Sequence, residues 1–343
     1  MPVRRSAAKR LLSVPALLCV ATMASCAHTT PSSRPGTSFA YVLTDGQGGT
    51  LSKVNLNTRR ILWTVESGTS GSVMVANSDQ LGICVGNDPD SGSIAFVNKN
   101  GSMGPRLSVP GSVQGLAYVS SHPQLIYVLW TEQSGASFVE AVAWPSGSVS
   151  WQKAVGFGAF ALVGSSVNDQ LALLTRASPS NGMGPGESDW LVILAAGTGM
   201  TSADTSLATP AAGLLFRRDG TLVVGEDRRL ATWSPSTNRI SQLANVGEDV
   251  AAATMHPIVE APGAMLLVSG AGGLSQVSPS GKTAYGGTWP GRAPPHSIAE
   301  TNTGTLLALM PRATLVEYRS STFVSQRLAD FSGIGEDVVA APW

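Results

Sequence analysis

The end of the chain repeats an internal stretch. Residues 335–341 read Gly-Glu-Asp-Val-Val-Ala-Ala, and residues 247–253 read Gly-Glu-Asp-Val-Ala-Ala-Ala. The internal copy continues into another apolar stretch at 265–268, whereas only Pro-Trp follows the terminal copy. A lone strand leaves backbone hydrogen-bonding groups open along its edge and needs a partner. We expect that partner to be the first apolar stretch, 39–43, so that the last strand joins the first ones and closes a ring.

A unit of four short strands recurs from residue 39 onward. Its second strand can be followed through Val42, Ile83, Tyr127, Leu171, Leu222, Leu266 and Leu306, at spacings of 40 to 51 residues. Four-stranded propeller blades repeat every ~40–45 residues. The pattern therefore predicts an all-β, seven-bladed β-propeller over 39–343, with four-stranded antiparallel blades. In the closing blade, 336–341 would be the inner strand beside 39–44, 50–56 and 60–66.

The inner strands are predicted from stretches that are dense in Val, Ala and Gly. Small residues suit the crowded axis of a ring, where neighbouring blades converge. The predicted inner strands are 72–76, 113–119, 159–163, 213–216, 250–254, 297–300 and 338–341. Only 13% of the residues are charged, against about 25% in ordinary globular chains. Together with 38 Gly and 21 Pro, this favours short strands and tight turns over long exposed helices.

The N-terminal residues are typical of an export signal. Arg4, Arg5, Lys9 and Arg10 precede an apolar run at 11–22, which is too short to span a bilayer as a helix. The following Met-Ala-Ser-Cys at 23–26 resembles the lipobox of bacterial lipoproteins, which implies cleavage before Cys26 and lipidation of its thiol. The alternative is an ordinary secretory cleavage site with Cys26 incidental. We expect 1–26 to be the signal segment and the Pro/Ser-rich 27–38 a flexible tether.

Several stretches resemble known propeller repeats. Residues 295–299 and 123–128 are similar to parts of the YVTN-type repeat, and 54–63 and 143–151 resemble the outer half of a PQQ-type, quinoprotein-like repeat. The resemblance implies the propeller fold and transfers no active-site residue to this chain.

The topology predicts where acidic side chains gather. In four-stranded blades, the loops between the second and third strands share one face with the loops that lead into the inner strands, and we call this the top face. Glu248, Asp249, His296, Glu336 and Asp337 begin three consecutive predicted inner strands at this face. They form a candidate cation or ligand site at the mouth of the central channel, because hard cations take carboxylate oxygens and His can share such a site. The alternative is turn chemistry, in which these side chains bond local backbone amides.

The bottom face is expected to carry the basic residues Arg59, Arg60, Lys99, Arg217, Arg218, Arg239, Lys282 and Arg319. His122 and His256 each precede Pro and are also expected at this face, away from His296, so that the three imidazoles do not converge on one metal. The only other cysteine of the mature chain, Cys84, lies in an apolar strand, and no G-x-S-x-G elbow occurs. A Gly/Pro/Ser-rich insertion at 178–187 is a second candidate for binding.

These observations favour a non-catalytic role. We expect an exported, lipid-anchored propeller on the extracytoplasmic face of the cell membrane, where it acts as a binding or scaffold module for a cell-envelope protein, a glycan or a small ligand. The net charge is zero, which gives no reason to expect nucleic acid as a partner. No cofactor is expected, with a divalent cation as the alternative. The alternative function is a propeller enzyme of the lyase, lactonase or quinoprotein-like kind, acting at the channel mouth.

Overall fold

The computed structural model describes residues 39–45, 49–67, 74–76, 80–85, 92–144, 146–177, 188–251, 254–289, 293–301, 304–319 and 324–340. The predicted signal segment with Cys26, the tether and the insertion at 178–187 lie outside the described residues, as does the side chain of Cys84. The described strands all belong to one compact unit, Pro35–Trp343. No helix in the described part of the chain is long and apolar enough to cross a membrane.

The strands form four-stranded sheets in which each strand pairs antiparallel with its neighbour. The sheet that contains both ends of the described chain has the order β28 (Ile334–Ala340), β1 (Phe39–Asp45), β2 (Thr50–Asn55) and β3 (Arg60–Glu66). The next two sheets along the chain consist of β4 (Met74–Ala76), β5 (Gln80–Val85), β6 (Gly92–Asn98) and β7 (Met103–Val109), and of β8 (Ser112–Ala117), β9 (Leu125–Thr131), β10 (Ala136–Ala143) and β11 (Val149–Phe157).

The remaining sheets follow the same plan, with the first strand of each innermost. Two consist of β12 (Ala161–Gly164), β13 (Gln170–Thr175), β14 (Trp190–Ala195) and β15 (Thr201–Ser206), and of β16 (Ala211–Phe216), β17 (Leu222–Glu226), β18 (Arg229–Ser234) and β19 (Arg239–Asn245). The last two consist of β20 (Ile258–Ala261), β21 (Met265–Ser269), β22 (Gly273–Val277) and β23 (Thr283–Thr288), and of β24 (Ser297–Glu300), β25 (Thr305–Met310), β26 (Thr314–Arg319) and β27 (Ser325–Asp330).

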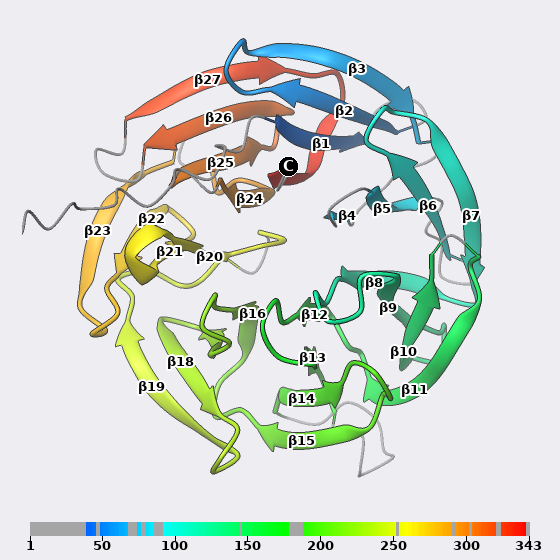
Figure 1. Ribbon diagram of the computed structural model, residues 1–343. Coiled ribbons are helices and arrows are strands. Elements are labelled where there is room, and N and C mark those ends of the chain that lie inside the picture. The colour runs from blue at the N-terminus through cyan, green and yellow to red at the C-terminus, as the bar shows by residue number, and fades with distance from the viewer. Residues whose placement is uncertain are drawn as a thin grey trace, which may run out of the picture. The chain divides into compact units, whose positions relative to one another are not determined.

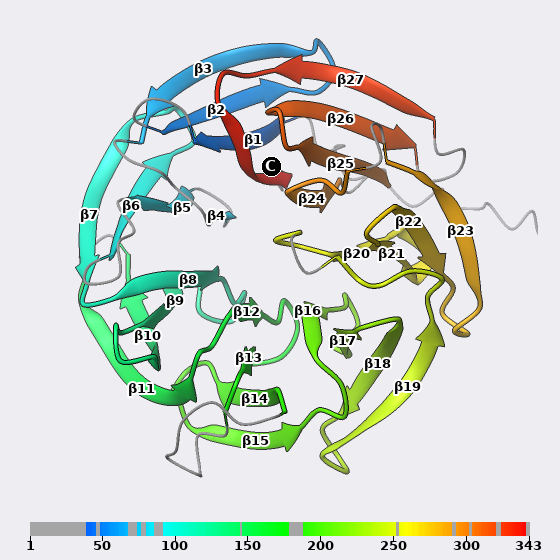
Figure 2. The same ribbon diagram turned by 180° about the vertical axis from the view of Figure 1, so that it is seen from behind.

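These sheets stand as blades around a central axis, so the fold is a β-propeller (Figures 1 and 2). The prediction of an all-β propeller with four-stranded antiparallel blades is confirmed. Seven blades were predicted. In six of the four-stranded sheets the structure describes the side chains of all four strands, which is one blade fewer than predicted. The remaining four-stranded sheet, β4 to β7, includes two strands of which only the backbone is described. The only helical element among the described residues is a 3₁₀ turn, Pro262–Ala264.

The C-terminal strand closes the ring, as predicted. β28 pairs antiparallel with β1, with Ala340 opposite Ala40 and Val338 opposite Val42, and a bulge lies between Leu43 and Thr44. The pairing joins segments that lie at opposite ends of the chain, and both views show β28 at the inner edge of β1 (Figures 1 and 2). Backbone groups on the inner edge of β1 are thereby satisfied by the end of the same chain.

The hydrophobic core lies between blades rather than inside one central layer. Each buried apolar cluster joins side chains of two consecutive sheets, as where Ala40 and Val42 of β1 pack with Leu307 and Leu309 of β25. Burying side chains between successive blades lets a domain of about 300 residues keep one continuous core.

Outer-strand tryptophans contribute to the same contacts between blades. The indole nitrogen of Trp151 on β11 donates to the carbonyl of Ala196 in the next blade at 2.9 Å. Gly199, with φ of +69°, lies under this ring, and a Cβ there would come within 2.6 Å of the indole. The resulting side-chain contact fastens one blade to the turn of the next, so a side chain at position 199 would disrupt it.

One predicted inner strand is wrong. The fifth inner strand is β20 (Ile258–Ala261), not 250–254. β20 pairs with β21 from Ile258 to Ala261 and is connected to it by the short 3₁₀ turn, which leaves only an isolated bridge between Val250 and Gly270. The likeness of 247–253 to the terminal strand therefore does not extend to their structures, because the inner edge of β21 is already occupied.

Candidate functional site

A cavity of about 370 Å³ runs through the centre of the propeller. Apolar residues of six inner strands line its middle, namely Leu116, Leu162, Leu214, Ile258, Ile298 and Val338. Polar side chains occupy the two ends, with His256 before the start of β20 and Glu300 at the end of β24. Because inner strands begin at the top face and end at the bottom face, the channel has an ionisable group at each end and an apolar middle.

The top end is organised around Asp337 of β28, whose side chain is fully buried. Ser297 Oγ donates a hydrogen bond to Asp337 Oδ1 at 2.5 Å, and the backbone N–H of Val338 donates to the same oxygen at 2.8 Å. His256 Nε2 lies 3.6 Å from Asp337 Oδ1. The carboxylate thus joins three inner strands or the loops that lead into them.

His256 presents its imidazole to the channel. Its side chain is 38% exposed, and it lines both the central cavity and an adjoining one of about 210 Å³ that includes Gln114 and Thr254. Burial alone would lower the pKa of His256, but the Asp337 carboxylate outweighs this effect and raises the pKa above its usual value. An imidazolium held in this way can donate a proton or a hydrogen bond to a molecule in the channel.

The prediction that His256 lies at the bottom face is wrong. The backbone N–H of Met255 donates to the carbonyl of His296 at 2.8 Å, which places the two histidines at the same end. The error follows from the misplaced inner strand, because a strand at 250–254 would put residue 256 after the strand, whereas β20 starts after it. His122 instead pairs with Asp169, with Nε2 to Oδ1 at 2.6 Å, in the turn that follows β8.

The five residues of the predicted top-face site separate into two groups. His296 Nδ1 is hydrogen-bonded to the Gly335 carbonyl. Burial and the carboxylate of Asp45 raise the pKa of Glu336, while His296 opposes this shift. His296, Glu336 and Asp337 therefore do lie together at the channel mouth.

Glu248 and Asp249 are held by other partners. Glu248 Oε2 accepts a hydrogen bond from the backbone N–H of Gly272 at 2.7 Å, and Asp249 Oδ1 accepts one from Arg228 Nε at 2.6 Å. The hydrogen bond from Arg228 lowers the pKa of Asp249. Neither contact is the bond to a local backbone amide that the alternative interpretation described, because Gly272 lies 24 residues from Glu248 and Asp249 pairs with an arginine side chain. Among the described residues, no three His, Cys, Asp or Glu side chains lie close enough together to hold a metal ion.

The bottom end holds a second group of charges, two arginines from the end of β16 and two glutamates from β20 and β24. Glu260 accepts hydrogen bonds from Arg217 Nε at 3.3 Å and from the backbone N–H of Arg218 at 2.6 Å. Arg217 Nη2 also donates to the Ala264 carbonyl at 3.2 Å. Arg218 Nη2 bridges the two strands, donating to Glu300 Oε2 at 2.6 Å and to the Glu260 carbonyl at 3.3 Å.

Glu300 is the least satisfied group of the bottom end. Its side chain is only 9% exposed, and Oε1 is buried with no hydrogen-bond partner among the described residues. Burial raises the pKa of Glu300 to about 7, opposed by Arg218 and reinforced slightly by Glu260. The carboxyl group therefore exchanges its proton near neutral pH, where acid–base and ligand-binding groups are most effective.

Sequence reasoning named neither Glu300 nor Glu260 as a site residue. Arg217 and Arg218 were expected at the bottom face, and 297–300 was correctly predicted as an inner strand. An acidic residue at the last position of an inner strand, beside a pair of arginines after another, is a signal that could have identified this end. The sequence could not show that His256 lines the channel, because that prediction requires the correct position of β20.

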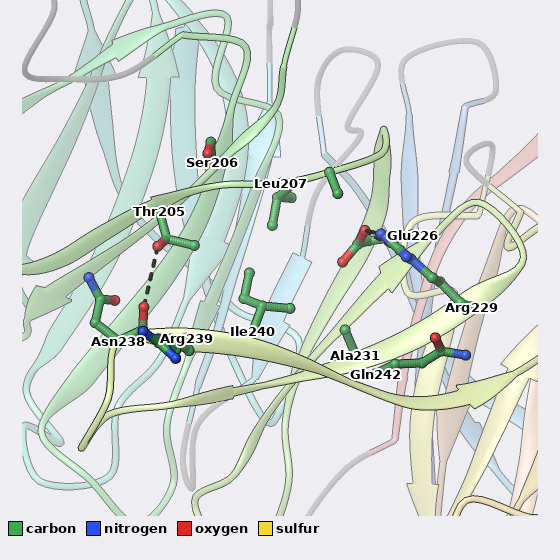
Figure 3. A pocket seen from close by; sticks show the side chains of 11 residues that line it. Thr205, Ser206, Leu207, Glu226, Arg229, Ala231, Asn238, Arg239, Ile240 and Gln242 are labelled. Carbon is green, nitrogen blue, oxygen red and sulfur yellow. Dashed lines mark hydrogen bonds and ion pairs between the residues drawn. The ribbon is translucent and has the colours of Figure 1, made fainter.

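A separate groove of about 370 Å³ lies away from the channel, between β15 and the outer strands β18 and β19 (Figure 3). Its buried Glu226 is paired with Arg229, Oε2 to Nη2 at 2.7 Å, and also accepts a hydrogen bond from Thr209. Thr205 Oγ1 donates to the Asn238 carbonyl at 3.5 Å across the groove. Because its buried carboxylate already has partners, the groove is a weaker candidate site than the channel.

Comparisons with known proteins support the propeller fold but do not show which family the chain belongs to. No family model matches the chain, and no curated protein sequence matches it. The structure is similar to a protein of unknown function from Desulfotomaculum acetoxidans, with a TM-score of 0.65 and 12% identity over 87% of this chain and 98% of that one.

Two further solved structures have names that mention an activity. A candidate 6-phosphogluconolactonase from Bacteroides uniformis has a TM-score of 0.65 and 12% identity, covering 88% of this chain and 99% of its own. The virginiamycin B lyase of Staphylococcus aureus has a TM-score of 0.56 and 11% identity, covering 76% and 84%. At these identities the likeness concerns the fold alone, which is one that hosts many functions.

Proposed function

We propose that this protein is a non-catalytic binding module whose central channel takes a small ligand. The observation that carries the proposal is the channel itself, with an apolar middle and a different ionisable group at each end. Small-ligand sites are typically concave cavities of ~300–1,000 Å³ lined mainly by apolar side chains with a few polar groups. The cavity of about 370 Å³ falls in that range.

The channel is tested with a neutral apolar fluorescent probe, N-phenyl-1-naphthylamine. Leu215 lines the channel, and the Leu215→Trp variant should fill it and abolish most of the probe's fluorescence gain. Leu62 is 50% exposed on outer strand β3, so Leu62→Trp is the matched control and should bind the probe as the wild type does. Equal binding by a folded Leu215→Trp variant would overturn the proposal.

We also propose that the module is exported and anchored by lipid at Cys26, on the extracytoplasmic face of the cell membrane. The basic residues, the apolar run and the cysteine at position 26 support this. Wild-type protein should incorporate labelled palmitate and partition into detergent, while Cys26→Ser should do neither. A Cys26→Ser chain that stayed labelled and membrane-bound would contradict the anchor.

A seven-bladed ring fits the sheet order best. The sheet β4 to β7 is the seventh unit of the proposal, since β4 contacts β28 on one side and β8 on the other. The assignment of its repeats to the YVTN or PQQ-like type belongs to the same proposal and is supported by the sequence resemblance alone. At the cell envelope, a protein or glycan partner would bind the exposed faces, and neutral net charge argues against nucleic acid.

A propeller enzyme is the second candidate, favoured by His256 beside Asp337 at the channel mouth. An imidazole with a raised pKa that faces a cavity can act as a general acid. Lyase or lactonase chemistry would then depend on His256, and a divalent cation at the mouth would require Glu248 and Asp249 to leave Gly272 and Arg228. Elemental analysis of the purified chain tests the cation form of this candidate, since a bound metal lost on Glu336→Gln would favour the enzyme.

A further inference from the structure

We propose that the bottom end of the channel binds the ammonium group of a small amine whose apolar chain lies in the channel. The inference rests on the proposed role of the channel as a ligand site and adds the chemistry of the ligand's head group. Glu300 is the group that would receive the ammonium, and Arg218, whose backbone N–H is bonded to Glu260, holds the Glu300 carboxyl group in place.

The hydrogen bonds already made at the bottom end indicate which kind of ligand head group could bind there. Arg218 Nη2 is already used, donating to Glu300 Oε2 and to the Glu260 carbonyl. Both oxygens of Glu260 accept hydrogen bonds. Among the buried side-chain atoms described at this end, the one without a hydrogen-bond partner is an acceptor, Glu300 Oε1. A ligand that completes this arrangement must therefore bring a donor, and a buried carboxylate is best satisfied by a charged one.

The position of Glu300 suits a ligand that enters along the channel. The side chain is nine-tenths buried and Glu300 is one of the residues that line the cavity, while the lining between the two ends is mostly apolar residues. An ammonium at Glu300 would have its alkyl chain against these walls, where burial of apolar surface contributes ~25 cal/mol per Å².

The free hydrogen-bonding capacity at each end sets the orientation of such a ligand. At the top end the Asp337 carboxylate already accepts hydrogen bonds from Ser297 and from a backbone N–H and lies beside His256, whereas at the bottom end Glu300 Oε1 has no partner among the described residues. The groups that face Glu300 are Arg218 from the end of β16 and Glu260 of β20. β25 has no titratable residue, and the acidic residues of β28, Glu336 and Asp337, are the third and fourth of its seven residues and contact groups of the top end. The ammonium therefore belongs at the bottom.

Binding should be linked to release of a proton. In the free protein Glu300 has a pKa of about 7, so about half of its carboxyl groups are protonated at that pH. An ammonium favours the ionised form, and binding at pH 7 should release about half a proton per ligand. A carboxylate ligand would instead favour the neutral form and cause proton uptake, so the sign of the proton count distinguishes the two.

The experiment is calorimetric titration of the full-length chain with n-hexylammonium, n-hexanol and n-hexanoate, each in buffers of different ionisation enthalpy. We expect hexylammonium to bind at least tenfold more tightly than hexanol, with proton release near pH 7. Glu300→Gln should lose that tenfold preference and the proton release. Glu66→Gln, an exposed position on β3, is the matched control and should keep both.

The outcomes separate this inference from the channel proposal. Hexanol binding that is blocked by Leu215→Trp, without a preference for hexylammonium, would overturn the ammonium site and leave the channel proposal intact. Hexanoate binding with proton uptake would overturn the ammonium site and show that the bottom end binds an anion. If none of the three ligands and no fluorescent probe bound to folded protein, both proposals would fail.

Discussion

The two ends of the channel each contain a buried carboxyl group, but the two groups differ in how many hydrogen-bond donors surround them. Asp337 at the top receives hydrogen bonds from Ser297 and from a backbone N–H, and His256 lies nearby. Glu300 at the bottom receives one from Arg218 and has a buried oxygen without a partner among the described residues. Burial therefore does not set the chemistry of a carboxyl group by itself, because the number of donors around it decides whether the charge is stabilised.

The difference has a plain structural origin. Asp337 lies at the middle of β28, where it meets the start of β24 and the loop before β20, and these supply a hydroxyl and an imidazole. Glu300 lies at the end of its strand, and the donors at that end are shared with Glu260. The buried carboxyl group at the top is thus held by several donors, while the one at the bottom has an oxygen without a partner among the described residues. Four predictions test this contrast.

The largest effect is expected from removing the strand that builds the top end. Deletion of 336–343 takes away most of β28 and Asp337 but leaves every charged group of the bottom end in the chain. Because β1 loses its inner partner and the ring opens, we expect loss of the cooperative thermal transition. Circular dichroism melting measures this, and a truncated chain with the full wild-type transition would argue against closure of the ring by β28.

The next largest effect is expected at Asp337 itself. Asp337→Ala leaves Ser297 and His256 without their acceptor inside the molecule, which should lower the free energy of unfolding by about 3 kcal/mol. Urea denaturation at constant pH gives this value. Asp249→Ala is the control on the same face, where an exposed pair with Arg228 is lost, and its denaturation midpoint should stay at the wild-type value. Equal losses in the two variants would mean that burial of Asp337 is unimportant.

The bottom end should make stability depend on pH. The folded pKa of Glu300, about 7, lies above its ordinary value of 4.5, so the folded state binds more protons than the unfolded state between these values. Stability should then fall as pH rises from 4.5 to 7, by at most about 3 kcal/mol. Denaturation across this range measures the slope. Glu300→Gln should flatten it, and an unchanged slope would show that Glu300 is not the group responsible.

A smaller pH effect is expected from the top end. The pKa of His256 is raised in the folded state by Asp337, so its contribution to stability is complete below pH 6.5 and is lost as pH rises through the folded pKa. His256→Gln should remove this loss above pH 6.5 and leave the slope between 4.5 and 6 intact. Double substitution with Glu300→Gln should remove both contributions additively, and any strong coupling would contradict the independence of the two ends.

Much of the fold could be predicted from the sequence because blades are local. The spacing of apolar strands and the intervening turns predicted four-stranded antiparallel blades, and the likeness of 335–341 to 247–253 pointed to a strand that needs a partner. That likeness also misled, since similar residues form a paired strand at β28 and only a single bridge at Val250. The local sequence favours a strand in both places, but only one place has a free strand edge beside it.

The site was predicted less well, because its geometry depends on which stretches pair as inner strands and local sequence does not decide this. His296, Glu336 and Asp337 could be placed because they follow from the position of two correctly predicted inner strands. His256 was misplaced because one strand was displaced by eight residues, from 250 to 258. Glu248 and Asp249 were placed on the right face. Their partners, Gly272 and Arg228, lie in neighbouring turns, and the pattern of strands does not predict which turn residues will meet.

By itself the sequence determined an all-β chain of repeating blades with an end that returns to its beginning, because apolar spacing and turn residues act over a few positions. The tertiary structure alone decided that His256 meets Asp337, and that Glu300 is buried beside Arg218 with one oxygen unused. Desolvation and charge–charge distance depend on which strands become neighbours around the axis. The two charged pairs at the ends of the channel therefore join residues 81 and 82 positions apart along the chain.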